Sequence, residues 1–144
     1  MGLTVYTGGT FDLFHSAHVV LLRRCKEIAG TDGKVIVALN TDEFIEAYKG
    51  KKPVISYEDR EKVLLSCRYV DGIVPNVGGA DSRVAIDLVS PDVIVIGSDW
   101  ARRDYYAQMM FTQDWLDERG IGLCYFPYTA GISSTEIKRR LAGK

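Results

Sequence analysis

The sequence predicts an α/β protein with about five parallel strands and helices on both faces of the sheet. Short apolar runs alternate with amphipathic segments, and each apolar run has about the length of one strand. Strands that are apolar throughout and separated by helices are typical of a mostly parallel sheet covered on both faces. We therefore expect a Rossmann-like fold made by a single domain, residues 1–144, which is compatible with excision from a longer protein.

The predicted strands are rich in β-branched and aliphatic residues. Segment 34–39 (KVIVAL) has the pattern of a buried strand, and segment 92–96 (DVIVI) repeats it. In chain order, the strands are expected at residues 3–7, 34–39, 72–75, 92–96 and 123–126.

The predicted helices are bounded by residues that favour helix ends. Ser56 precedes Glu58 and Asp59, and acids are favoured in the first helical turn, while Gly120 is a typical stop. Ser133 and Glu136 have the spacing of a capping box. The helices are expected at residues 16–29, over a short stretch from about 41, from 56 to about 67, at 83–89, at 105–119 and from 133 onward.

Composition and charge exclude several classes of protein. The formal net charge is −1, so no global basic field indicates nucleic-acid binding. No apolar run reaches the roughly 18 residues of a membrane span, and no signal peptide is recognisable. The 3 cysteines are scattered without Cys-x-x-Cys spacing, which fits a reducing compartment. We expect a cytoplasmic protein that binds neither nucleic acid nor membrane.

Ligands of open parallel sheets bind at the carboxyl ends of the strands, near the point where the strand order reverses. The functional loops are therefore expected at residues 8–18, 40–52, 97–103 and 127–135. The first of these contains Gly8 and Gly9, which let the backbone approach a ligand closely. It runs directly into a helix, whose free N–H groups can hold an anion.

His15 and His18 are the 2 histidines of the chain and lie three residues apart at the start of that helix. This spacing places them on one helix face. Two imidazoles beside a helix N-terminus can donate to phosphate oxygens and stabilise charge on a leaving pyrophosphate. A metal site is an alternative, although only Asp12 is near enough in sequence to extend the ligand set, and a purely structural pair is another.

Segment 15–18 (HSAH) resembles the HxGH signature of the nucleotidyltransferase superfamily that includes glycerol-3-phosphate, phosphocholine and phosphoethanolamine cytidylyltransferases. Ala17 stands in place of the family glycine. The resemblance covers nearly the whole chain and is closest to glycerol-3-phosphate cytidylyltransferases. The other segments that match in order and spacing are 41–44 (TDEF), 57–60 (YEDR), 68–71 (RYVD), 97–100 (GSDW) and 131–135 (GISST).

The resemblance implies a role for each matching position. His15 and His18 would act in catalysis on the triphosphate, and Lys51 would neutralise phosphate charge. The residues expected to bind the nucleotide are Gly9, Thr10, Phe11, Gly97, Asp99, Tyr128, Thr129, Ser133, Ser134 and Thr135, with Asp99 beside the base. The residues expected on the acceptor side are Asp12, Asp42, Lys49, Arg60 and Arg68.

The resemblance also implies the reaction. A phosphate or phosphonate oxygen of a small acceptor, of the glycerol 3-phosphate or hydroxyalkyl phosphonate type, would attack the α-phosphorus of CTP in line, and pyrophosphate would leave. Positioning and charge neutralisation carry such a reaction. Mg²⁺ would bridge the phosphates through water and substrate, so no metal ligand from the protein is predicted. A homodimer is expected from the same resemblance.

Two segments depart from the family pattern. Tyr128 stands where these cytidylyltransferases commonly carry an arginine, which removes a charge-assisted contact worth about 1.5–3 kcal/mol. Arg102, Arg103 and Lys138 are the candidates to replace it. The loop 76–82 (NVGGADS) lacks the aromatic residue expected beside the acceptor, so the acceptor stays open.

Three alternative functions follow from these patterns. An adenylyltransferase of the same superfamily would use ATP and a sugar phosphate. A nucleotide-binding module without catalysis is the alternative of another class, which the intact histidine pair disfavours. A nicotinamide-dependent oxidoreductase is disfavoured because the first loop lacks the Gly-x-Gly-x-x-Gly pattern.

Overall fold

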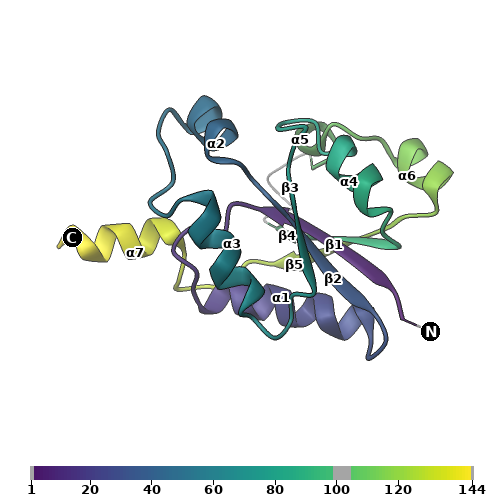
Figure 1. Ribbon diagram of the computed structural model, residues 1–144, viewed down its shortest axis with the longest axis horizontal. Coiled ribbons are helices and arrows are strands. Elements are labelled where there is room, and N and C mark those ends of the chain that lie inside the picture. Colours follow the sequence, from purple (N-terminus) through teal and green to yellow (C-terminus); the bar gives the residue numbers. More distant parts are fainter. Residues whose placement is uncertain (1, 99–104, 144) are drawn as a thin grey trace.

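The computed structural model describes residues 2–98 and 105–143 and contains one sheet of five parallel strands (Figure 1). The strands are β1 (Thr4–Gly9), β2 (Lys34–Leu39), β3 (Gly72–Pro75), β4 (Val93–Ser98) and β5 (Gly122–Pro127). Their order is β3-β2-β1-β4-β5, so the strand order reverses between β1 and β4. The predicted Rossmann-like α/β fold is confirmed, and the loop after β1 lies at the reversal point.

Helices cover both faces of the sheet. The helices are α1 (Ser16–Ala29), α2 (Asp42–Lys49), α3 (Tyr57–Leu65), α4 (Arg83–Val89), α5 (Tyr105–Met109), α6 (Gln113–Arg119) and α7 (Ser134–Leu141). One core contains Leu22 of α1 and Leu64 of α3, and the other contains Ile86 of α4 and Leu116 of α6. Helix α7 has no buried residue and extends away from the sheet at its carboxyl end (Figure 1).

The strands are apolar throughout because successive side chains enter different cores. In β4, Val95 lies in the core of α1 and α3, whereas Ile94 and Ile96 lie in the core of α4 and α6. In β1, Val5 and Tyr6 divide between the two cores in the same way. This alternation is the period of two expected of a strand buried on both faces.

The single helix predicted at 105–119 is wrong. The structure has two helices, α5 and α6, separated at Met110, whose φ of 62° is left-handed. The break lets Phe111 reach the core, where it is 3% exposed and stacks on Trp115 with ring centroids 6.2 Å apart. Thr112 then begins α6 by accepting a hydrogen bond from the backbone N–H of Trp115.

The capping box predicted at α7 is half formed. The Ser133 hydroxyl accepts from the backbone N–H of Glu136 at 3.0 Å, as predicted. The Glu136 carboxylate bonds instead to Arg139 and Arg140, because two guanidinium groups compete with one backbone N–H.

Two remaining features bear on the surroundings of the protein. No helix in residues 2–98 or 105–143 is both long and apolar enough to cross a membrane. All 3 cysteines are free thiols: Cys25 is buried, and Cys67 and Cys124 are half-buried.

Candidate active site

The loop after β1 is held in a strained conformation. Phe11 and Leu13 both have a φ of 51°, in the left-handed region that residues other than glycine rarely adopt. Such residues cost about 1–3 kcal/mol each and occur most often at functional sites. The strained loop presents His15 as the N-cap of α1 and packs the buried ring of Phe11 5.1 Å from that of His18.

His15 and His18 cap α1 together. Nδ1 of His15 accepts from the backbone N–H of Ala17, and Nδ1 of His18 accepts from the backbone N–H of His15, both at 3.2 Å. The two rings stack with centroids 3.7 Å apart. Because both Nδ1 atoms are acceptors, the proton of each neutral imidazole lies on Nε2, where it can be donated to a ligand.

The same packing keeps both imidazoles neutral. Burial lowers the pKa of His15. Burial and then the neighbouring His15 lower the pKa of His18 to about 4, against a smaller opposing effect of Asp12. The histidines are therefore uncharged hydrogen-bond donors near pH 7, and any cationic charge at the site comes from other side chains.

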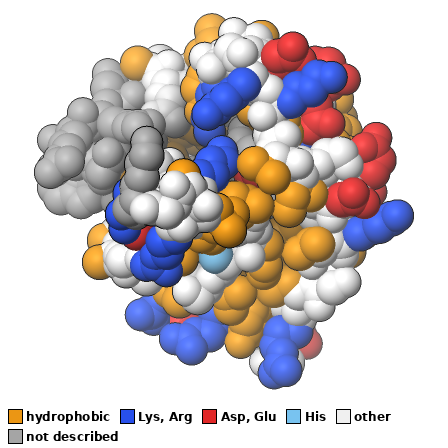
Figure 2. Space-filling model, turned by 90° about the vertical axis from the view of Figure 1, so that its left-hand side faces the viewer, with side chains coloured by type: hydrophobic (Ala, Val, Ile, Leu, Met, Phe, Trp, Pro, Cys, Tyr) orange, Lys and Arg blue, Asp and Glu red, His pale blue; other side chains and the backbone are white. Residues whose placement is uncertain are grey.

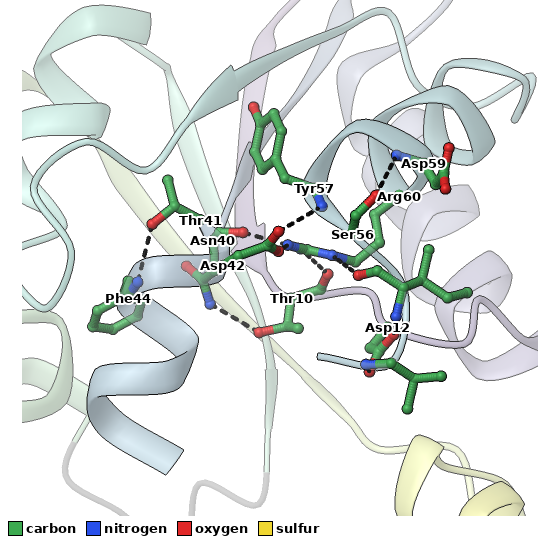
Figure 3. A network of polar contacts seen from close by, with 12 residues as sticks. Thr10, Asp12, Asn40, Thr41, Asp42, Phe44, Ser56, Tyr57, Asp59 and Arg60 are labelled. Atoms are coloured by element: carbon green, nitrogen blue, oxygen red, sulfur yellow. Dashed lines mark hydrogen bonds and ion pairs between the residues drawn. The ribbon is translucent and has the colours of Figure 1, made fainter. Parts of the chain in front are cut away.

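Arg60 joins the loops that surround the site (Figure 3). Its side chain is fully buried, with 0% exposure. It donates from Nη1 to the carbonyls of Thr10 and Asn40 at 2.8 and 3.0 Å, and from Nε to that of Ile55 at 2.9 Å. Nη2 bonds Oδ1 of Asp42 at 2.7 Å. The ends of β1 and β2 are thereby tied to the segment before α3.

Asp12 ties the lysine-containing loop between α2 and α3 to the same point. Its carboxylate is 6% exposed and accepts from the backbone N–H groups of Val54 and Ile55 at 2.7 and 2.9 Å. Asp12 and Arg60, which were expected on the acceptor side, are both buried and bonded to other groups of the protein. A buried charge requires such partners. Most of the partners here are backbone atoms of segments that are distant in sequence. Asp42, whose side chain is 27% exposed, belongs to this network.

A first cleft of about 860 Å³ opens between α1, the end of β5 and the start of α7. It brings together the two expected catalytic histidines, His15 and His18, and half of the residues expected to bind the nucleotide: Gly97, Tyr128, Thr129, Ser133 and Ser134. Gly131, at φ 90°, makes the turn into α7. The charged residues of its described lining, Arg24, Glu136 and Arg140, were not among the predicted site residues. Figure 2 shows a histidine in this hollow among hydrophobic side chains, with Lys and Arg side chains around it.

A second cleft of about 570 Å³ lies over the carboxyl ends of β1, β2 and β3 and shares Gly97 and Tyr128 with the first. Gly9 and Thr10 line it, together with Tyr6, Phe44 and Tyr48. Its described lining contains no Asp, Glu, Lys or Arg. The cleft is thus a neutral space bounded by hydroxyl, amide and aromatic groups.

Two asparagines form a hydrogen-bonded ladder along this second cleft. Nδ2 of Asn76 donates to Oδ1 of Asn40 and to the carbonyl of Gly79, both at 2.9 Å, and Nδ2 of Asn40 donates to Oγ1 of Thr10 at 3.1 Å. Oδ1 of Asn76 is buried and accepts no hydrogen bond from the described chain. Neither asparagine was among the predicted site residues, although Asn40 begins the expected functional loop 40–52 and Asn76 likewise directly follows a strand.

The other predicted residues lie outside these clefts. Lys49 and Lys51 are exposed on α2 and on the loop after it, and Thr135 is exposed on α7. Arg68 lies in the turn between α3 and β3, at the amino edge of the parallel sheet, whereas the histidines are at the carboxyl edge. Asp99 lies outside the described residues, as do Arg102 and Arg103. Lys138 lines neither cleft in the described part of the chain.

Two neutral imidazole donors face a helix N-terminus across a cleft at the reversal point of a parallel sheet. This arrangement is suited to a nucleotide, whose phosphates need donors and whose transfer needs them in fixed positions. The model of the cytidylyltransferase-like family matches residues 6–140, and the chain belongs to that family. It is a nucleotidyltransferase.

Individual relatives agree with this assignment. The chain is 39% identical to glycerol-3-phosphate cytidylyltransferase of Staphylococcus aureus, over 97% of this chain and 96% of the relative. It is 30% identical to FAD synthase of Korarchaeum cryptofilum, over 98% and 92%. Among solved structures, the lipopolysaccharide core biosynthesis protein of Thermoplasma volcanium matches with a TM-score of 0.69 at 21% identity, over 92% of this chain and 100% of that one. That last likeness concerns the fold alone.

Proposed function

We propose that the protein transfers CMP from CTP to the phosphate or phosphonate of a small acceptor and releases pyrophosphate. The observation that carries the proposal is the pair of His15 and His18, which both line the first cleft and whose Nδ1 atoms are fixed by backbone N–H groups. The relatives named glycerol-3-phosphate cytidylyltransferase support CTP as the donor and glycerol 3-phosphate as one acceptor.

In the proposed reaction, an acceptor oxygen attacks the α-phosphorus while the bond to the leaving pyrophosphate breaks. The imidazole donors and the free N–H groups at the start of α7 stabilise charge on the phosphates. Lys51, which is exposed outside both clefts, would have to move toward the reacting phosphates with its part of the loop before α3. The acceptor is already an anion, so its attack requires positioning and charge neutralisation rather than a covalent intermediate on the protein.

Mg²⁺ is part of this proposal as a companion of the triphosphate. The described residues contain no group of 3 or more His, Cys, Asp or Glu arranged to hold a metal ion. The Asp12 carboxylate, the acid nearest the histidines in sequence, is occupied by backbone N–H groups. We therefore propose that the ion would be held by phosphates and water, as is common for Mg²⁺.

The second cleft is the proposed acceptor site. It meets the first cleft at Gly97 and Tyr128, so a molecule in one lies next to a molecule in the other. Its neutral, hydroxyl-rich and amide-rich lining suits the uncharged, hydroxyl-bearing part of an acceptor. Asn76 also carries a buried oxygen that lacks a donor, and acceptor hydroxyls are donors. Both glycerol 3-phosphate and a hydroxyalkyl phosphonate have such hydroxyls.

Adenylyl transfer from ATP is the second candidate. Two observations favour it. FAD synthases are among the relatives, and FAD contains an adenylate. In addition, Tyr128 replaces the arginine common in cytidylyltransferases.

The proposed subunit assembly is a homodimer, supported by the exposed apolar side chains of Val63 and Leu65 on α3, and sedimentation analysis would test it.

The proposed function is tested by supplying purified protein and Mg²⁺ with CTP or ATP, each with glycerol 3-phosphate, hydroxyalkyl phosphonates or sugar phosphates. Pyrophosphate release and product mass are recorded. A CMP-linked product is the expected result, and its mass names the acceptor. An AMP-linked product would overturn the choice of CTP, and nucleotide binding without any product would favour a non-catalytic module.

A further inference from the structure

The first cleft needs cationic charge that its histidines do not supply. A nucleoside triphosphate carries several negative charges, whereas burial keeps His15 and His18 neutral. The charged residues among the described lining are Arg24, Glu136 and Arg140. Arg24 lies on the α1 side, over the ring of Phe126 at 6.0 Å.

Arg140 is directed toward the start of α7. Although it lies in the last turn of the helix, its Nη2 donates to the carbonyl of Gly131, which precedes the helix, at 3.1 Å. Its Nε donates to Oε1 of Glu136 at 3.1 Å. The guanidinium is thereby held beside the first turn, where unpaired N–H groups and the positive end of the helix dipole favour an anion.

We propose that Arg140 is a nucleotide-binding residue that supplies the cation missing at Tyr128, and that it exchanges Glu136 for the triphosphate when the nucleotide enters. This inference rests on the proposed function, because the ligand is the donor nucleotide of that reaction. Arg140 was not among the candidates from the sequence; of those, Lys138 lies within the described residues and lines neither cleft.

The neighbouring Arg139 lowers the free energy needed to separate Arg140 from Glu136. Arg139 bonds both carboxylate oxygens of Glu136, through Nε to Oε2 at 2.8 Å and through Nη2 to Oε1. When Arg140 leaves, the carboxylate keeps this two-point partner and is not left unpaired. Arg140, by contrast, gains phosphate oxygens, which match its planar donors better than a shared carboxylate oxygen.

Arg139 is also a matched control. Both arginines lie on α7, both pair with Glu136 and both are about half exposed, at 53% and 58%, but only Arg140 lines the cleft. The experiment compares Arg140→Gln with Arg139→Gln. The dissociation constants for CTP with Mg²⁺ and for uncharged cytidine are measured by calorimetry, without acceptor and over a range of KCl concentrations.

Arg140→Gln is expected to weaken CTP binding by about 10-fold to 100-fold, as for one charge-assisted contact, and to leave cytidine binding unchanged. The salt dependence of CTP binding should fall as well, and Arg140→Lys should recover part of the affinity. Arg139→Gln keeps the Arg140 guanidinium at the cleft but removes the other partner of Glu136, so it should weaken CTP binding by a clearly smaller factor than Arg140→Gln. Equal CTP affinities for wild type and Arg140→Gln would overturn the inference alone. Failure of the wild type to bind either CTP or ATP would overturn the proposed function and the inference with it.

Discussion

Nδ1 of His18 accepts the backbone N–H of His15 at 3.2 Å, so the second histidine caps the helix turn that the first one begins. One contact therefore fixes the backbone of the loop, the tautomer of His18 and the direction of its Nε2–H group. The site gains a rigid donor without a charge, and this separates hydrogen bonding to the phosphates, by imidazoles, from charge neutralisation, by Lys and Arg side chains.

Replacing His18 by Ala should lower turnover by about 100-fold or more, the usual effect of removing one donor to a transition-state oxygen. Stability should fall by about 1 kcal/mol, because the N–H of His15 loses its capping partner. Steady-state kinetics and urea unfolding measure the two effects. Ser16→Ala, an exposed change in the same helix turn that lines neither cleft, is the control. Near-normal turnover of His18→Ala would show that the imidazole has no part in the reaction.

The stability of the protein should fall between pH 6.5 and pH 4 through His18. Its pKa is about 4 in the folded protein and 6.5 in an unfolded chain, so below pH 6.5 the unfolded chain takes up a proton that the folded protein does not. The stabilisation is complete above pH 6.5 and is lost as the pH falls toward 4. One unit of pKa corresponds to about 1.4 kcal/mol, so at pH 4.5 the expected loss is about 2.5 kcal/mol.

His18→Asn isolates this effect, because an amide oxygen can still cap the helix but does not titrate. The free energy of unfolding of both proteins would be measured at pH 7 and pH 4.5. The carboxylates titrate in both proteins, so their contribution cancels when the two losses are compared. A larger loss in the wild type is expected. Equal losses in the two proteins would mean that the pKa of His18 is close to that of an exposed histidine.

Arg60→Met should destabilise the protein by about 3–5 kcal/mol, the cost of leaving one partner of a buried ion pair alone. Three backbone carbonyls also lose their donor. Urea unfolding measures the change, and Arg68→Met, at an exposed position, should stay within about 0.5 kcal/mol. If Arg60 contacts only the acceptor, the KM of the acceptor would rise while stability stays constant.

Asn76→Ala should raise the KM of the acceptor by about 10-fold, since the asparagine ladder that shapes the second cleft loses two hydrogen bonds of about 1 kcal/mol each. The KM of CTP should change little, because Asn76 does not line the first cleft. Val77→Ala, an exposed neighbour, serves as the comparison. A rise in the KM of CTP alone would assign the second cleft to the nucleotide instead.

The strands could be predicted because runs such as 34–39 are apolar on both faces, and the first loop because it combines glycines and histidines within one turn. The break at Met110 could not be predicted, since nothing in the local sequence favours a left-handed methionine. The gain from burying Phe111 decides it, and that gain depends on residues of the sheet.

The candidate site shows the same limit. Periodicity and spacing found His15, His18 and the start of α7, which lie together in the first cleft. They could not show that Arg60 is buried, because its acceptors include backbone carbonyls of three separate segments, and a carbonyl has no signature in sequence. The family motif predicts a ligand contact for Arg60, and the structure adds that its guanidinium is bonded to three backbone carbonyls and to Asp42.

Gly97 and Tyr128 belong to both clefts, so the Tyr128 side chain and the backbone of β4 at Gly97 form the wall between the two proposed substrates. A larger or differently charged residue at position 128 would change the binding of the nucleotide and of the acceptor at the same time. One substitution at residue 128 would therefore change the selectivity for the nucleotide and the selectivity for the acceptor together. A variant of the protein that adopts a new nucleotide through residue 128 must also adapt its acceptor, whereas changes at Arg140 or Asn76 alter one choice at a time.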